Sequence, residues 1–274
     1  MSAFRAGLFT GKTAVVTGGA TGIGYAISAE LRSLGARVLI ASRNEVKLRE
    51  ASEKLNVDYY VANIRKEEEV AALINAAQQK FGDPVDLLVN NGGGQFPSKA
   101  EDITSKGWSA VLETNLTGAF LCSREFKRAR SERGLHGGAI VNITCDYHNG
   151  FPGMAHTGSA RAGVENLTRS LSVEWASEGI RVNAVAPGII YSESASANYS
   201  SPDYLTRLAH RIPSKRLGTP QEVSAAVCFL LSDATASYIT GATLRVDGAS
   251  SLNGPMAWLV PDHDKAPQSP PPLE

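Results

Sequence analysis

The 274-residue chain lacks the features that mark several large classes of protein. Its 27 basic and 27 acidic side chains cancel, so the composition predicts neither a nucleic-acid partner nor an anionic membrane surface. No stretch approaches the ~18 apolar residues of a membrane span, and the segment Met1–Arg5 begins no signal-peptide core. We therefore expect a soluble, cytoplasmic protein.

Cysteine and histidine are also too few and too scattered for a metal centre. Cys122, Cys145 and Cys228 have neither metal-ligand nor redox spacing, which favours reduced thiols in a reducing compartment. No internal repeat is visible. We expect one α/β domain over residues 1–265 and a disordered, proline-rich tail over 266–274.

The strongest signal present is the glycine-rich segment Thr17–Gly24 (TGGATGIG), directly after the apolar run Thr13–Val16. A strand that enters such a turn and then a helix presents backbone N–H groups and a helix N-terminus to a pyrophosphate. An ordinary turn is the alternative. The residues predicted to hold the cofactor phosphates are Gly18, Thr21, Gly22, Ile23 and Gly24.

The strands that follow indicate where the rest of a dinucleotide would lie. The predicted second strand, Arg37–Ala41, ends in Ser42 and Arg43, where a carboxylate would favour NADH, so the sequence favours NADPH. A solvated surface arginine is the alternative. Further cofactor contacts are predicted at Asn63 and Ile64 after the third strand, and at Asn91, Gly92 and Gly93 after the apolar run Asp86–Val89.

Five motifs in order make the chain resemble the short-chain dehydrogenase/reductase family over about residues 10–250. They are the glycine-rich segment, the block Asn90–Gly93, Asn115, Pro187-Gly188, and the ending Ile239–Gly248. The resemblance implies a Rossmann-like doubly wound parallel sheet of about seven strands, with Pro187, Gly188 and Ile190 beside the nicotinamide.

Within that family, residues 90–96, 106–115, 160–164 and 260–264 resemble the peroxisomal trans-2-enoyl-CoA reductases. The chain does not end in a Ser-Lys-Leu-like tripeptide, so a peroxisomal location rests on the resemblance alone. The resemblance also implies a homo-oligomer, a tetramer, with helices near Trp108 and Ala160 paired across subunits.

The chain departs from the family pattern at the catalytic positions. Aligning Arg161 with the usual lysine puts Thr157 where tyrosine belongs and Thr144 where serine belongs. A threonine hydroxyl cannot act as an acid near neutral pH as an activated phenol does, so simple ketone reduction is disfavoured. Arg161 remains a cation able to bind the nicotinamide ribose.

Conjugate reduction of an enoyl thioester needs donors for an enolate oxygen, and the candidates are Asn115, Thr144, Tyr147 and Thr157. Tyr147 matches a displaced tyrosine of the related dienoyl-CoA reductases, and its alternative role is an aromatic shelf against the cofactor. Asp146 and His148 flank it as further alternatives.

The sequence thus favours NADPH-dependent reduction of the 2,3-double bond of a trans-2-enoyl-CoA, an acyl-CoA thioester. The alternatives are a 2,4-dienoyl-CoA or specialised-metabolite reductase, and an NADP-binding protein that has lost reductase activity. The segment Tyr191–Pro213 breaks the regular pattern, so we expect an irregular substrate lid there.

Overall fold

The computed structural model describes residues 2–191, 202–253 and 261–265. Seven parallel strands form one sheet in the order β3-β2-β1-β4-β5-β6-β7, which confirms the predicted doubly wound sheet. The strands are β1 (Thr13–Thr17), β2 (Arg37–Ser42), β3 (Asp58–Val61), β4 (Leu87–Asn90), β5 (Ala139–Ile143), β6 (Arg181–Pro187) and β7 (Thr243–Val246).

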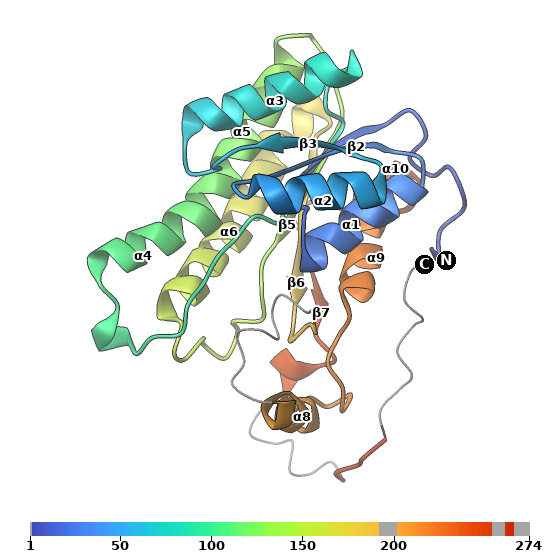
Figure 1. Ribbon diagram of the computed structural model, residues 1–274. Coiled ribbons are helices and arrows are strands. Elements are labelled where there is room, and N and C mark those ends of the chain that lie inside the picture. Colours follow the sequence, from blue (N-terminus) through green and yellow to red (C-terminus); the bar gives the residue numbers. More distant parts are fainter. Residues whose placement is uncertain (1, 192–201, 254–260, 266–274) are drawn as a thin grey trace.

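Helices cover both faces of the sheet (Figure 1). One buried cluster joins the sheet to α1 (Gly22–Ser33), α2 (Glu45–Leu55) and α9 (Pro220–Leu231). The other joins it to α3 (Glu67–Phe81), α5 (Gly118–Ser131) and α6 (Ala155–Glu174). Because both faces are covered, the central strands are buried along their whole length and carry near-continuous apolar sequences.

The shorter elements complete the chain. They are the short helices η1 (Ala100–Asp102), η3 (Ala176–Glu178) and η4 (Ser250–Leu252), the helices α4 (Ser105–Leu112), α8 (Pro202–Arg211) and α10 (Asp233–Ala236), and the π-helical turn η2 (Glu113–Thr117). No helix within the described ranges is long and apolar enough to cross a bilayer.

The site follows from the strand order. β1 pairs with β2 on one side and with β4 on the other, so β2 and β3 extend the sheet on one side of β1 and β4 to β7 extend it on the other. In doubly wound sheets a ligand crevice opens at the carboxyl ends of the strands at this switch point. The predicted cofactor segments after β1, β2, β3 and β4 therefore come to one edge of the sheet.

Two sequence predictions need correction. The segment predicted to be irregular contains a helix, α8, whose tertiary position the local pattern did not reveal; residues 192–201 of that segment lie outside the described residues, as does the predicted tail 266–274. The apolar spacing over Tyr25–Leu34 predicts the first helix, which in the structure begins three residues earlier, at Gly22, because the glycine turn itself supplies its first turn.

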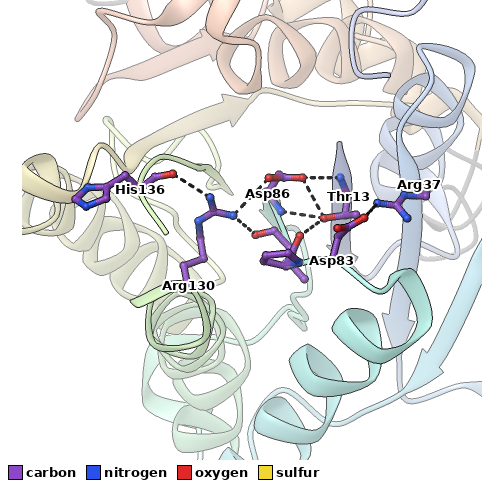
Figure 2. Close-up of polar contacts among 8 residues, drawn as sticks. Thr13, Arg37, Asp83, Asp86, Arg130 and His136 are labelled. Carbon is purple, nitrogen blue, oxygen red and sulfur yellow. Dashed lines mark hydrogen bonds and ion pairs between the residues drawn. The ribbon is translucent and has the colours of Figure 1, made fainter. Parts of the chain in front are cut away.

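The opposite edge of the sheet is held by a polar network around Arg130 (Figure 2). The Arg130 guanidinium is 5% exposed and donates to the carbonyl oxygens of Val85, at 2.8 Å, and His136, at 3.1 Å. It also lies 3.5 Å from Asp86, whose other carboxylate oxygen accepts the backbone N–H of Thr13 at 2.9 Å. The network therefore joins α5 to the beginnings of β1 and β4.

We expect Arg130→Met to lower the free energy of unfolding by about 3 kcal/mol, because it leaves buried carbonyl groups and a carboxylate without their donor. Arg128→Met, on the same helix but 53% exposed at its side chain, should cost less than about 1 kcal/mol. Urea unfolding followed by circular dichroism measures both. Equal losses for the two variants would contradict a structural role for the buried network.

Candidate active site

The glycine-rich turn after β1 has the geometry that a pyrophosphate site requires. Gly18 and Gly22 both have positive φ angles, +64° and +54°, which side chains with a Cβ rarely adopt. At Gly24 a Cβ would collide with the carbonyl oxygen of Gly18, so this glycine allows α1 to begin against the turn. A backbone cradle that a Cβ would fill thus stands at the N-terminus of α1.

Side chains from β1 and the β4 loop hold this cradle in place. The Asn91 amide donates to the carbonyl oxygens of Thr17 and Gly18, both at 3.1 Å. In return, the Thr17 hydroxyl accepts the backbone N–H groups of Asn91, at 3.1 Å, and Gly92, at 2.9 Å. The Asn91 side chain thus braces the turn from behind.

A cleft of about 680 Å³ runs from this cradle across the carboxyl ends of β4, β5 and β6. Twelve of the predicted site residues line it: Gly18, Thr21, Gly22, Ile23, Gly24, Asn91, Gly93, Thr144, Arg161, Pro187, Gly188 and Ile190. Residues from five separate segments of the sequence therefore converge on one cleft.

Two hollows extend the cleft past Gly18 toward the ends of β2 and β3. One, of about 670 Å³, contains Ser42 and Arg43 together with Lys47, a second cation that the sequence analysis did not single out, and Glu45. The other, of about 110 Å³, is lined by Asn63, Ile64 and Gly92. The Asn63 side-chain oxygen accepts the Arg65 backbone N–H at 3.2 Å. These hollows have the position expected for an adenosine and its phosphate.

Arg161 supplies the fixed positive charge of the cleft. Its Nη1 donates to the carbonyl oxygen of Ile143, at the end of β5, and its Nη2 lies so close to Gly93 that a Cβ there would collide with it. Burial lowers the pKa of the Arg161 guanidinium below its usual value, yet arginine stays protonated in proteins. Beside it, the Thr144 hydroxyl donates to the Val185 carbonyl at 3.2 Å.

Asn115 lies under the cleft wall and not among its lining residues. It is 1% exposed and sits in the π-helical turn η2, where its amide donates to the carbonyl oxygens of Gly94, at 2.7 Å, and Val111, at 2.8 Å. Its Oδ1 has no partner among the described residues and faces the α-carbon of Gly93. Asn115 therefore links the π-helical turn to the loop that carries Gly93.

Thr157, at the usual tyrosine position, does not line the cleft either. It is fully buried, and its hydroxyl lies 3.4 Å from Nδ1 of His156, which also accepts the Thr157 backbone N–H at 2.9 Å. The threonine side chain is thus too short to reach the space that a tyrosine at this position would occupy.

The structure directs Tyr147 away from the cleft, although the sequence analysis made it a candidate donor. Its phenol donates to the Glu165 carboxylate on α6, which also pairs with Arg169. Burial and the hydrogen bond to Glu165 raise the pKa of Tyr147 well above its usual range. The phenol is therefore a weaker acid than a free tyrosine, the reverse of what a general acid requires.

Sequence reasoning missed part of the cleft wall. Gln95, Phe151 and Met154 line it at the end away from the glycine turn, and the backbone N–H of Ser98 donates to the Gly153 carbonyl at 2.7 Å, which joins the two loops. Gln95 directly follows the predicted glycine block, a signal that could have found it. Phe151 and Met154 sit in a loop with no comparable motif.

Comparisons with known proteins agree with this geometry. The sequence pattern of the family described as enoyl-(acyl carrier protein) reductase matches residues 18–250. The chain is 37% identical over 250 residues to a probable 2,4-dienoyl-CoA reductase, (2E)-enoyl-CoA-producing, of Bacillus subtilis (strain 168), covering 88% of this chain and 97% of that relative.

Two solved structures are similar as well. The citronellol catabolism dehydrogenase of Pseudomonas aeruginosa PAO1 has a TM-score of 0.80 and 42% identity, covering 91% of this chain and 99% of that one. A variant of the actinorhodin polyketide ketoreductase, determined with NADPH, has a TM-score of 0.83 and 31% identity, covering 90% and 99%.

The Cys145 thiol lines the cleft but should react slowly. Burial raises the pKa of Cys145 to about 11. The charge of Arg161 lowers this pKa in part, and Asp146 adds a smaller increase. At pH 8 we therefore expect iodoacetamide to alkylate Cys145 on the order of a hundredfold more slowly in the folded protein than in urea, because little thiolate is present. The folded rate should rise with pH toward 11. Peptide mass spectrometry measures it, and equal rates with and without urea would contradict a buried, neutral thiol.

Proposed function

The chain belongs to the short-chain dehydrogenase/reductase family, and on that premise we propose that it catalyses NADPH-dependent reduction of the 2,3-double bond of a trans-2-enoyl-CoA. The proposal depends on two observations taken together: Arg161 lines the cleft, and a buried Thr157 stands where family members have tyrosine. Among the described residues that line the cleft there is no tyrosine.

This pairing favours conjugate reduction over ketone reduction. A ketone becomes an alkoxide that must receive a proton at once, and the described cleft holds no phenol to supply it. In an enoyl thioester, hydride adds to the β-carbon, negative charge gathers on the thioester oxygen, and the α-carbon is protonated afterwards. That oxygen needs oriented hydrogen-bond donors more than it needs an acid.

The chain's own residues can meet this demand. The glycine cradle suits a dinucleotide diphosphate, and a bound nicotinamide cofactor would supply the hydride. Arg161 Nη2 and the Thr144 hydroxyl stand on the cleft wall at the end of β5, where the thioester oxygen would be bound. The Thr144 hydroxyl has one proton, which it gives to the Val185 carbonyl, so it would turn from that carbonyl to donate to the thioester oxygen. Because Arg161 keeps its charge, it would stabilise the enolate by electrostatic attraction without transferring a proton.

A second candidate is reduction of a 2,4-dienoyl-CoA, which the name of the Bacillus subtilis relative favours. The enolate chemistry is the same in both reactions, so the donors described above would serve either substrate. A specialised-metabolite reductase and a protein that binds NADP without catalysis are the remaining alternatives from the sequence.

The deciding measurement is single-turnover oxidation of NADPH with saturating crotonyl-CoA, a longer trans-2-enoyl-CoA, a 2,4-dienoyl-CoA and a simple ketone. We expect rapid oxidation with an enoyl-CoA and little with the ketone. In the same assay Thr144→Val should lose about 10²–10³ in rate, because it removes an enolate donor. Tyr147→Phe and Thr157→Val should stay near the wild-type rate, because neither side chain lines the cleft.

Each other outcome has a definite meaning. Faster turnover of the dienoyl-CoA would support the second candidate, and tight NADPH binding with no turnover of any thioester would support loss of activity. A hundredfold loss in Thr157→Val or Tyr147→Phe, with Thr144→Val unaffected, would show that the donor is assigned to the wrong residue.

The preference for NADPH over NADH rests on the hollow at the end of β2. Arg43 and Lys47 bring two cations there, against one carboxylate from Glu45, and the Ser42 hydroxyl adds a donor. An acidic ribose ligand is missing from the strand end, and a guanidinium there suits a 2′-phosphate.

We expect Arg43→Asp to weaken NADPH binding by roughly 10- to 100-fold and to spare NADH, because it removes a charge-assisted contact worth about 1.5–3 kcal/mol. Arg49→Asp, at an exposed position on α2 outside the hollow, is the matched control and should leave both affinities unchanged. Titrations followed by cofactor fluorescence give the dissociation constants. Equal affinities of the unaltered protein for NADPH and NADH would refute the preference.

We also infer a homo-oligomer, a tetramer. Trp108 on α4 and Phe120 on α5 are each 38% exposed, and large apolar side chains on neighbouring helices suit a subunit contact. Sedimentation at micromolar concentration separates this from a monomer of about 29 kDa.

A further inference from the structure

The charges of this chain balance overall but are unevenly placed around α8. Between Asp203, in the first turn of α8, and Glu222 the sequence contains no aspartate or glutamate, and it contains four permanent cations and one histidine. The five side chains are Arg207, His210, Arg211, Lys215 and Arg216. In a protein with 27 residues of each sign, such a run is a local positive surface.

This surface borders the cleft. Leu208 of α8 lines the cleft, and Arg211, one helical turn further, lies on the same side of the helix as Leu208. Arg207 precedes Leu208, and both arginines are exposed. Figure 1 shows α8 set apart from the helices that cover the faces of the sheet, beyond the ends of β6 and β7.

The position of this surface is fixed by contacts at the end of α8. The Asn253 side chain donates to the Arg211 carbonyl at 3.1 Å, close to Ser250, which also lines the cleft. Lys215 donates to the His210 carbonyl at 2.8 Å, which closes the turn after the helix. The cations therefore stand at the rim and not on a separate lobe.

Two of the cations already have acidic partners. Arg216 makes two hydrogen bonds to Glu222, at 2.9 and 2.6 Å, and Lys215 lies 2.6 Å from Asp262. Arg207 and Arg211 have no acidic partner among the side chains that the structure describes, and they are the guanidinium groups placed to receive an anion at the rim.

We propose that Arg207 and Arg211 bind the phosphate groups of coenzyme A at the cleft mouth while the thioester lies inside beside Thr144 and Arg161. The inference rests on the proposed function. An acyl-CoA joins an uncharged acyl-pantetheine arm to a diphosphate and a 3′-phosphate, so its charge is concentrated at one end. That distribution matches a cleft with cations at its rim, and the guanidinium fork is suited to phosphate.

The test compares two thioesters that share the reacting group, one with the phosphate-bearing end of coenzyme A and one truncated before it. Crotonyl-CoA carries the phosphates, and crotonyl-N-acetylcysteamine carries the same reacting group without them. For Arg207→Glu/Arg211→Glu we expect KM for crotonyl-CoA to rise at least tenfold with kcat nearly unchanged, and KM for the N-acetylcysteamine thioester to stay within twofold. The second substrate also shows that the variant is folded.

A matched control reverses two exposed cations away from the cleft. Lys54→Glu/Arg133→Glu makes the same change in net charge, at the end of α2 and in the turn after α5. It should leave KM for both thioesters unchanged. An equal rise in KM for crotonyl-CoA in this control would show that only net charge matters, and would overturn the proposal.

Direct binding separates this inference from the proposed reaction. With NADP⁺ present, calorimetric titration should show that CoA binds more tightly than pantetheine, and Arg207→Glu/Arg211→Glu should abolish the difference. If CoA binds in this way but no enoyl-CoA is reduced, the proposed reaction fails and the phosphate site stands. If CoA binds no more tightly than pantetheine, the phosphate site fails whatever the activity.

Two further results would overturn the proposal. A parallel rise in KM for both thioesters in the α8 variant would mean that the arginines act on the shape of the cleft. A loss confined to crotonyl-(acyl carrier protein), with crotonyl-CoA unaffected, would assign the surface to a carrier protein.

Discussion

The structure depends on a clamp at the end of β1. The Thr17 hydroxyl and the Asn91 amide join the glycine turn to the loop after β4. This is the point where the strand order reverses, with β2 on one side of β1 and β4 on the other. At Gly24 a Cβ would collide with the turn and prevent α1 from beginning there. The cradle is therefore set by backbone and short side chains, whose conformational freedom is small, and it is preorganised for a diphosphate.

The same contacts position the loop after β4, which reaches the centre of the cleft. Gly93, the residue after Gly92, has no side chain, which leaves room for the Arg161 guanidinium and the Asn115 side chain. Arg161 is in turn held by the Ile143 carbonyl at the end of β5. A positive charge thus stands at a fixed place in a partly enclosed cleft, where it stabilises an anion more than it would in water.

The threonine at position 157, where family members have tyrosine, leaves the fold unchanged. Thr157 packs against His156 within the first turn of α6, and Arg161 remains one turn further on the same helix. The family architecture is therefore retained although no phenol stands at this position. This is the general behaviour of doubly wound folds, in which the reaction depends on a few side chains carried by an unchanged scaffold.

The sequence by itself determined the parallel sheet, the glycine cradle and most of the cleft wall. Buried strands appear as local apolar runs, and positions where only glycine fits appear as glycines in the sequence. Only the tertiary structure decided the direction of Tyr147, which turns to Glu165 on α6, and the burial of Thr157. It also decided that α8 is a helix whose arginines stand beside the cleft. The partner of Tyr147 lies 18 residues away in the sequence, and the burial of Thr157 and the place of α8 depend on how whole elements pack, so no local pattern specifies them.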